Sequence, residues 1–227
     1  MPEVFEESSW CLLSVSDQDV RFFVVGLDSG IGFPLQTFDL NPSDFDDARF
    51  SYDGVDTIVY WGRGKAKVAS LSLADGEVTN IGPIPYIDAV VFTEDEVVLA
   101  TPGQFRVYED IDALAANEPT RALPGSWNDF NLDYNEGLFY TSWFADGRLT
   151  VLNAEGMEID RVPLRDFNDF IDGIVATGEF FHILDSRNGS LLRFNNQGVR
   201  ETVLAFGMSL VGRVSGLYCT ESSLADG

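Results

Sequence analysis

The amino-acid sequence predicts an all-β fold in which five four-stranded antiparallel units close into a ring. The first observation is a short signal, an aromatic residue followed two positions later by aspartate, that returns about every 41 residues. The second is that each return precedes short β-branched and aromatic runs separated by turns rich in Gly, Asp and Asn, a pattern typical of strands. The third is that the two chain ends together supply the strands of one more unit.

The repeat can be followed from aspartate to aspartate. Asp47 in FDDARF is followed 41 residues later by Asp88 in YIDAVVF, and another 41 residues later by Asp129 in WNDF. Asp172 in FIDGIV stands 43 residues further on. One more step of 41 residues leads to Arg213 in VGRVSG, a degenerate fifth copy. Near-constant spacing over most of the chain indicates one structural unit used repeatedly.

Each unit continues in the same way, with an inner strand after the aspartate and three further strands. The second-strand runs are DTIVYW, EVVLAT, LFYTSWF and FFHIL. The third-strand runs are KVASLSL, FRVYE, RLTVLN and SLLRFN, and the fourth-strand runs are VTNIGPI, TRALPG, IDRVPL and ETVLAF. One stretch departs from strand character: YEDIDALAANEP, 108–119, predicts a short helix with Asp110 as its cap and Pro119 as its stop.

The chain ends complete the ring. Three strands precede residue 46, in SWCLLSV, VRFFVVG and PLQTFDL, and one follows the last full unit, in GRVSGLYCT. We expect the C-terminal strand to be the innermost strand of a fifth unit, paired with SWCLLSV, because this closure leaves no open edge in the ring. The chain is then a single domain, 1–227. Its units are 9–45 plus 211–220, 46–86, 87–127, 128–168 and 169–206.

The only two cysteines, Cys11 and Cys219, fall on the two strands of this join. Aligning the fifth unit on its neighbours places them near each other, as a disulfide or, in a reducing cytoplasm, as two free thiols. The one histidine, His182, lies in the middle of the run FFHIL, where a buried core or channel histidine is expected. With one His and two Cys far apart in sequence, a zinc site or a Cys/His nucleophile pair is not expected.

Four strands in a unit of about 41 residues are typical of a β-propeller blade, and the sequence resembles the β-propeller superfamily over nearly its whole length. Neither the Trp-Asp signature nor the double glycine of kelch repeats is present, so no specific family is identified. The resemblance implies that the loops entering the inner strands lie near the central axis on one face. The ligand sites of propellers usually sit on that face.

At this face the repeat places a ring of polar residues, Asp47, Asp88, Asp129 and Asp172, completed by Arg213. Carboxylates that converge on one axis repel one another, so a bound cation, the arginine, water or backbone N–H groups must offset the charge. Oxygen ligands favour Ca²⁺ or Mg²⁺ over zinc. The alternative is structural: each aspartate caps its own loop by accepting backbone N–H hydrogen bonds, and a residue repeated in every blade suits that role.

Five further residues are candidates for a binding site. Trp61 and Trp143 end the second strands of alternate blades, near the same rim. They either stack on a sugar or a partner's side chain, or pack between blades. Arg63, Lys65 and Lys67 form a basic cluster in the loop GRGKAK. This cluster either anchors a carboxylate or an acidic partner, or is a solvated loop.

The chain is strongly acidic: 37 Asp and Glu residues stand against 14 Lys and Arg, a formal net charge of −23. Such a surface repels phosphate backbones and anionic lipid, so neither nucleic acid nor membrane insertion is expected. Acid-rich, lysine-poor chains are typical of halophiles that accumulate salt, because screening relieves the repulsion between their charges. The alternative is an ordinary acidic protein from a GC-rich genome.

No secretory signal or membrane-spanning run is visible in the sequence, so we expect a cytoplasmic or virion-associated protein. Two functions are considered. The first is a non-enzymatic binding or structural module that contacts a protein or a glycan, and the lack of a Ser/His/Asp arrangement favours it. The alternative is a Ca²⁺-dependent hydrolase or lyase with its site at the top of the central channel, similar to the lactonase-like propellers.

Overall fold

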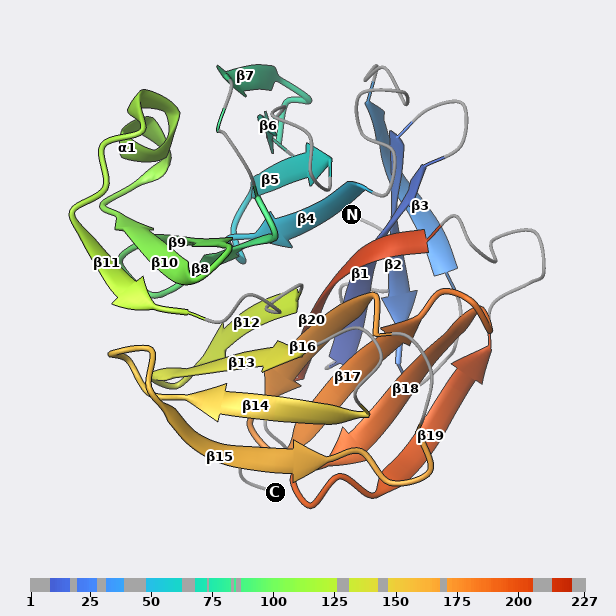
Figure 1. The fold of residues 1–227 in the computed structure, drawn as a ribbon. Helices are drawn as coiled ribbons and strands as arrows, with labels where there is room; N and C mark the ends of the chain where they lie inside the picture. Colours follow the sequence, from blue (N-terminus) through green and yellow to red (C-terminus); the bar gives the residue numbers. More distant parts are fainter. Residues whose placement is uncertain are drawn as a thin grey trace, which may run out of the picture.

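In the computed structural model the chain forms five four-stranded antiparallel sheets arranged in a ring, the architecture of a five-bladed β-propeller (Figure 1). The structure describes residues 9–16, 20–27, 32–38, 48–62, 68–72, 74–82, 84, 87–125, 131–142, 147–167, 171–205 and 214–221. The prediction of an all-β propeller closed by its two end strands is confirmed.

Each blade takes the name of its innermost strand. The β4 blade contains β4 (Ala48–Tyr52), β5 (Thr57–Gly62), β6 (Val68–Ser72) and β7 (Val78–Gly82). The β8 blade contains β8 (Ala89–Phe92), β9 (Val97–Thr101), β10 (Gln104–Tyr108) and β11 (Arg121–Pro124). The β12 blade contains β12 (Asn131–Asn135), β13 (Leu138–Ser142), β14 (Arg148–Leu152) and β15 (Glu158–Pro163). The β16 blade contains β16 (Gly173–Thr177), β17 (Phe180–Asp185), β18 (Ser190–Asn195) and β19 (Arg200–Ala205).

The fifth blade combines both ends of the chain. The β20 blade has the strand order β20 (Val214–Glu221), β1 (Ser9–Ser16), β2 (Val20–Gly26) and β3 (Gly32–Phe38). Its innermost strand β20 lies beside β4 on one side and β16 on the other. The remaining neighbours are β4 with β8, β8 with β12, and β12 with β16, so the five inner strands surround one axis.

The join itself is an antiparallel ladder between β1 and β20. Ser9 is paired with Glu221, and two positions further along the ladder Cys11 is paired with Cys219. A disulfide connects these cysteines across a sequence separation of 208 residues. The ladder shifts register after Leu13, where β20 carries an extra residue. The ring is therefore closed by both backbone hydrogen bonds and a covalent bond.

The short helix that the sequence predicts is confirmed as α1 (Ile111–Ala116) between β10 and β11. Asp110 is its N-cap, and the carboxylate accepts a hydrogen bond from the Ala113 N–H at 2.7 Å. The helix ends at Asn117, which adopts a left-handed conformation with φ of 55°. Asn117 therefore ends the helix before Pro119 is reached.

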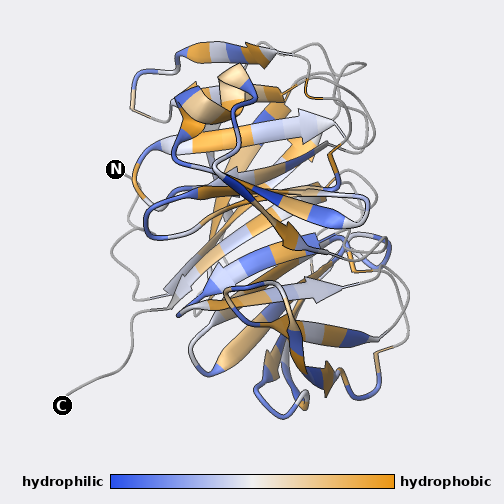
Figure 2. Cartoon of the chain, turned by 60° about the vertical axis from the view of Figure 1, so that its left-hand side comes forward, coloured by the Kyte–Doolittle hydropathy of each residue, from blue (hydrophilic) through white to orange (hydrophobic). Residues whose placement is uncertain are grey.

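The hydrophobic core lies between the blades. Four clusters of buried residues fill the interfaces between neighbouring blades. Between the β20 and β4 blades, the Phe22 ring meets those of Phe50 and Tyr60 edge to face, with centroids 5.2 and 6.0 Å away. Figure 2 shows hydrophobic residues along the strands and hydrophilic residues at the turns. Each blade is thus stabilised by its neighbours.

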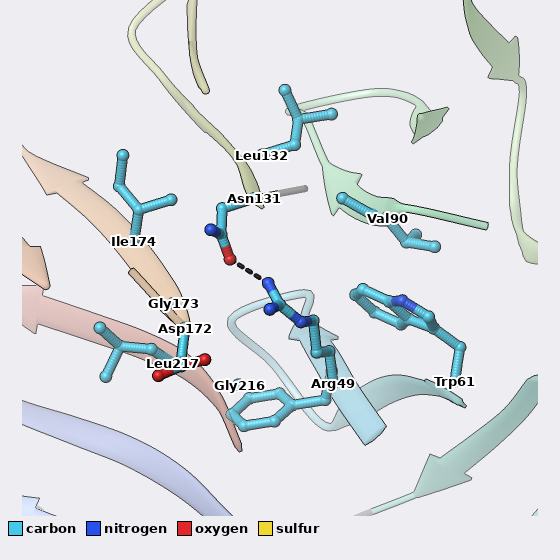
Figure 3. Close-up of a pocket in the computed structure, with 12 residues that line it drawn as sticks. Arg49, Trp61, Val90, Asn131, Leu132, Asp172, Gly173, Ile174, Gly216 and Leu217 are labelled. Atoms are coloured by element: carbon cyan, nitrogen blue, oxygen red, sulfur yellow. Dashed lines mark hydrogen bonds between the residues drawn. The ribbon is translucent and has the colours of Figure 1, made fainter. Parts of the chain in front are cut away.

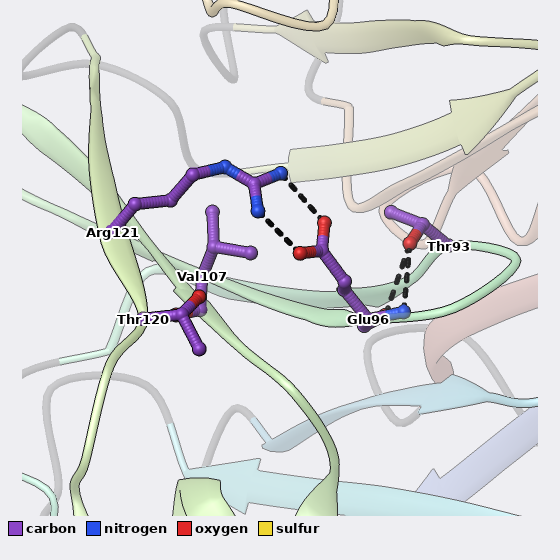
Figure 4. A network of polar contacts seen from close by, with 5 residues as sticks. All are labelled: Thr93, Glu96, Val107, Thr120 and Arg121. Atoms are coloured by element: carbon purple, nitrogen blue, oxygen red, sulfur yellow. Dashed lines mark hydrogen bonds and ion pairs between the residues drawn. The ribbon is translucent and has the colours of Figure 1, made fainter.

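A polar network fixes one outer strand. Arg121 on β11 forms two hydrogen bonds with the carboxylate of Glu96, at the turn before β9 (Figure 4). The Glu96 N–H donates to the Thr93 hydroxyl at 3.1 Å, and the Thr120 hydroxyl donates to the Val107 carbonyl at 3.1 Å. The ion pair is partly exposed, so its contribution to stability is at most about 1 kcal/mol. Its main effect is to hold the edge of the β8 blade in place.

Gly216 is required where β20 meets β4. It is the extra residue of the β20 ladder and has a φ of +73°. A Cβ atom at this position would stand 2.5 Å from Cδ1 of Phe50 and 2.9 Å from its backbone nitrogen. Gly137, in the turn between β12 and β13, has a similar φ of +82° but no atom within 4 Å of such a Cβ. Comparing substitutions at the two glycines therefore distinguishes the effect of backbone strain from that of steric overlap.

We expect Gly216→Ala to lower the free energy of unfolding by about 3 kcal/mol or more, because it adds overlap with Phe50 to the strain of a left-handed residue. Gly137→Ala, the control, pays only the backbone term of about 1 kcal/mol. Urea unfolding followed by circular dichroism measures both. Equal losses in the two variants would show that close contact between β20 and β4 does not limit residue 216.

Candidate functional site

The central channel is the candidate site, because the five inner strands converge there. Near the start of these strands the structure has a cavity of about 30 Å³ (Figure 3). This space suits a small number of water molecules rather than an organic substrate.

Arg49 and Asn131 form the polar centre of this level of the channel. Nη1 of Arg49, on β4, donates a hydrogen bond to Oδ1 of Asn131, on β12 (Figure 3). Nδ2 of Asn131 in turn donates to the Ser142 hydroxyl at 3.0 Å and to the Ile171 carbonyl at 2.9 Å. Both Arg49 and Asn131 are buried. The network ties β4 to β12, across the position of β8, and then to the segment that enters β16.

Two of the four predicted ring aspartates fall within the described residues. Asp172 lines the cavity, and its Oδ2 accepts hydrogen bonds from the N–H and the hydroxyl of Ser186 at 3.1 and 2.6 Å. Asp172 therefore caps the turn after β17 rather than its own loop. Asp88 is buried at the start of β8, where its N–H donates to the Ala100 carbonyl at 3.0 Å. Asp47, Asp129 and Arg213 lie outside the described residues, so the ring as a whole stays a prediction.

Trp61 is buried, with 2% of its surface exposed. It lies on β5, directly across the ladder from Arg49, and belongs to the hydrophobic cluster between the β4 and β8 blades. Of the two roles considered for it, inter-blade packing agrees with this position. The other candidates for a binding site lie outside the described residues: Trp143, Arg63, Lys65 and Lys67.

Asp133 introduces a second carboxylate to the channel, about 6–7 Å further along β12 than Asn131. Its Oδ2 accepts a hydrogen bond from the Ala176 N–H of β16 at 2.6 Å. Burial raises the pKa of Asp133 from its usual 3.8 to about 7. Burial, and then the charge of Asp133, also raises the pKa of Tyr218 on β20. The Tyr218 ring packs against Tyr52 of β4, with centroids 4.9 Å apart.

Sequence reasoning missed Arg49, Asn131 and Asp133. Arg49 and Asn131 stand two positions after the repeated aspartate, where Val90 and Ile174 occur in other blades. A polar residue at a repeat position that is apolar in other blades is the signal that could have found Arg49 and Asn131. Using this signal also requires knowing that these positions lie near the axis of the central channel.

The structure also brings together three residues that the sequence keeps far apart. Cys11, Cys219 and His182 are all buried, and one potential ligand atom from each lies within 4.8 Å of the others. Strand β17, which carries His182, packs beside β20. Separation along the chain is therefore a poor guide to distance here, because the closing blade places strands from both chain ends beside β17.

Comparisons with known proteins support the fold. No protein-family model matches the chain, and no match was found among curated proteins. A chain in the crystal structure of a nidogen/laminin complex is 9% identical, with a TM-score of 0.62, over 94% of this chain and 99% of that one. Glutaminyl cyclase of Myxococcus xanthus is 13% identical, with a TM-score of 0.53, over 68% of each chain. At these identities the likeness shows the β-propeller fold alone.

The raised pKa of Asp133 predicts that stability depends on pH. Between pH 4 and 7 the folded chain keeps a proton that the unfolded chain has lost, so the free energy of unfolding falls as pH rises through this interval. We expect Asp133→Asn to remove this slope. At pH 8 the free energy of unfolding of Asp133→Asn should exceed that of the parent by on the order of 1 kcal/mol. This value is modest because Asp133 is only partly buried, so solvent screens part of the effect. At pH 4 the two should agree.

Urea unfolding of both proteins from pH 4 to pH 8 measures the difference between their free energies of unfolding. The other carboxylates contribute equally to both proteins, so their effect cancels in this difference. A constant difference across this range would contradict the assignment of the titration to Asp133.

The Ca²⁺ hypothesis for the aspartate ring is tested by calorimetry. If the ring holds Ca²⁺, Asp88→Asn and Asp129→Asn each weaken Ca²⁺ binding. If each aspartate is a cap, the variants lose about 1 kcal/mol of stability and change no ion binding. A wild-type protein that releases no heat with Ca²⁺ or Mg²⁺ would end the metal hypothesis.

Proposed function

We propose that the chain is a non-enzymatic binding module that contacts a partner protein through the outer strands of the β12 and β16 blades. The observation that carries this proposal is the exposure of aliphatic side chains there. Met157, Ile159 and Val203 are 55%, 56% and 50% exposed, and Val199 is 37% exposed. Of six large hydrophobic residues exposed among the described residues, these four lie on or directly before β15 and β19.

The two strands belong to neighbouring blades that contact each other. The Arg165 N–H, just after β15, donates to the Gly198 carbonyl in the turn before β19 at 2.8 Å. A groove of about 380 Å³ opens beside this contact. Phe167 and Leu192 supply apolar surface to it, and Arg200 supplies a cation. Apolar surface with a charged rim is typical of a protein–protein contact.

The outer strands also offer backbone groups to a partner. Within the described sheets, β15 pairs with β14 alone and β19 pairs with β18 alone. The outer side of each strand therefore presents N–H and C=O groups to which an extended segment of another protein can add. Aliphatic side chains next to such an edge favour a protein over a glycan, whose rings are bound mainly by aromatic side chains. Trp61, the described candidate for sugar stacking, is buried.

The solved neighbours agree with more than one role. The nidogen/laminin complex is an assembly of proteins, whereas glutaminyl cyclase is an enzyme. A propeller fold therefore serves both functions, and the site decides. The Ca²⁺-dependent hydrolase or lyase would need a free carboxylate ring at the channel mouth. One oxygen of Asp172, Oδ2, already accepts two hydrogen bonds from Ser186, which leaves this carboxylate less free to hold a cation.

We extend the proposal to a high-salt origin, in a halophile or its virus, because salt screens the repulsion that a net charge of −23 on 227 residues causes.

The part of the chain that the structure describes contains no helix with the length and apolar character of a membrane span.

A photo-crosslinking amino acid placed at Val203 or Ile159 should capture one defined protein from an extract of the organism that encodes the chain. The same amino acid at Val55, which is 80% exposed on a different blade, should not. With the captured protein purified, Ile159→Ser combined with Val203→Ser should weaken binding at least about tenfold, since two aliphatic side chains are lost. Val55→Ser should leave binding unchanged. Equal capture from Val55, or no effect of the double substitution, would contradict the proposed surface.

The thermal midpoint of unfolding should rise from low to molar KCl, because salt screens the repulsion between carboxylates. Sucrose at equal osmolality serves as the control, since it favours compact states without screening charge. A midpoint that is flat in KCl, or that rises equally in sucrose, would remove the argument for a high-salt origin.

A further inference from the structure

The strand pair that closes the ring carries an unusual set of side chains. Cys11 and Cys219 are the only cysteines of the chain, and His182 is its only histidine. Cys11 and His182 have no exposed surface, and Cys219 is 4% exposed. Their potential ligand atoms all lie within 4.8 Å of one another. Three soft or borderline metal-binding groups thus meet at one buried point of the fold.

Three different strands position these groups. Cys11 on β1 and Cys219 on β20 face each other in the ladder, with Cα atoms 4.0 Å apart. His182 comes from β17 of the neighbouring blade, and is held in the middle of its sheet between Val175 of β16 and Arg193 of β18. The ladder pairs β1 with β20 on both sides of the cysteines. The positions of all three groups therefore do not depend on the disulfide bond alone.

The surroundings favour a metal that leaves the site neutral. The cysteines belong to a buried apolar cluster that includes Leu13, Leu184 and Leu217. A net charge in such surroundings is costly. Two thiolates and a neutral imidazole bound to Zn²⁺ carry no net charge, whereas a monovalent cation would leave one negative charge. Cysteine sulfur and histidine nitrogen are also the common ligands of Zn²⁺.

A cavity borders the site at His182. It has a volume of about 190 Å³ and is lined by His182, Leu27, Leu191, Arg193, Thr202 and Leu204. Arg193, on the wall, lies 3.6 Å from a carboxylate oxygen of Glu201 and stacks over the Phe180 ring. The space admits water, which can supply the fourth ligand that tetrahedral Zn²⁺ needs.

We propose that Cys11, Cys219 and His182 form a redox-gated zinc site that holds the ring closed when the disulfide is reduced. In the oxidised chain the disulfide occupies both sulfur atoms. A cellular dithiol passes two electrons and two protons to the disulfide and itself becomes a disulfide, which leaves two thiols. Zn²⁺ then binds both sulfurs and the imidazole, and the two thiol protons are released to solvent.

The test compares zinc binding by the same chain in two redox states. The protein is reduced anaerobically with a phosphine, which takes up oxygen from water as its hydrogens pass to the sulfurs, and the reagent is then removed. Zn²⁺ is titrated in competition with a chromophoric chelator. One Zn²⁺ should bind per reduced chain, at least about tenfold more tightly than to the oxidised chain. The oxidised chain is a matched control, because it has the same surface carboxylates.

Two variants and a spectroscopic measurement identify the ligands. Cys11→Ser and His182→Gln should each weaken binding to the reduced chain by about tenfold or more. X-ray absorption of the zinc-bound parent should show two sulfur atoms at about 2.3 Å and an imidazole nitrogen at about 2.0–2.1 Å. These ligands can come only from the three residues, so this result carries the proposal even where a variant does not fold.

The proposal is overturned if the reduced chain binds no zinc, whether or not the chain stays folded without the disulfide. It is also overturned if the oxidised chain binds zinc equally well, or if the absorption spectrum shows oxygen ligands without sulfur. None of these outcomes bears on the exposed aliphatic surface of β15 and β19, which contains none of the three zinc ligands.

Discussion

The pairing of β1 with β20 is the interaction on which the rest of the structure depends. Every hydrophobic cluster among the described residues lies between blades, so each blade relies on its neighbours to bury its apolar faces. In an open row of five blades, two would each expose an apolar face. The end strands prevent this by sharing one sheet, which places the first and last blades against each other and buries both faces.

Closure also dictates what the centre can contain. Five inner strands around one axis leave little room, so backbone approaches backbone at Gly216 and Gly173, where any Cβ would meet a neighbouring side chain at less than 3 Å. The polar side chains that do enter the channel must satisfy one another. Arg49 and Asn131 form a hydrogen bond with each other. Asp133 has a backbone N–H as a partner, but burial still raises its pKa. The narrow channel leaves the outer strands as the more accessible surface.

The fold could be predicted because the same four-strand sequence pattern occurs in each blade. A strand that is hard to recognise in one blade can be placed by comparison with the others. The leftover strands at the two ends then determine the closure and the nearness of Cys11 to Cys219. The site could not be predicted in the same way, because function resides where the blades differ. Arg49 and Asn131 replace apolar residues at a single position of the repeat. The nearness of His182 to the two cysteines could not be predicted from their positions along the chain, because the interface between two blades brings the three residues together.

The position of the disulfide has a mechanical consequence. Because β1 and β20 are antiparallel, both chain ends leave the ladder at the same edge, where Ser9 is paired with Glu221. Tension applied to the two ends therefore opens the ladder one pair at a time, as a zipper. The third pair it reaches is Cys11 with Cys219, and there the covalent bond transmits the force directly from one end to the other. The 208-residue span between the cysteines then bears no tension, so the blades keep their shape while the ends are pulled.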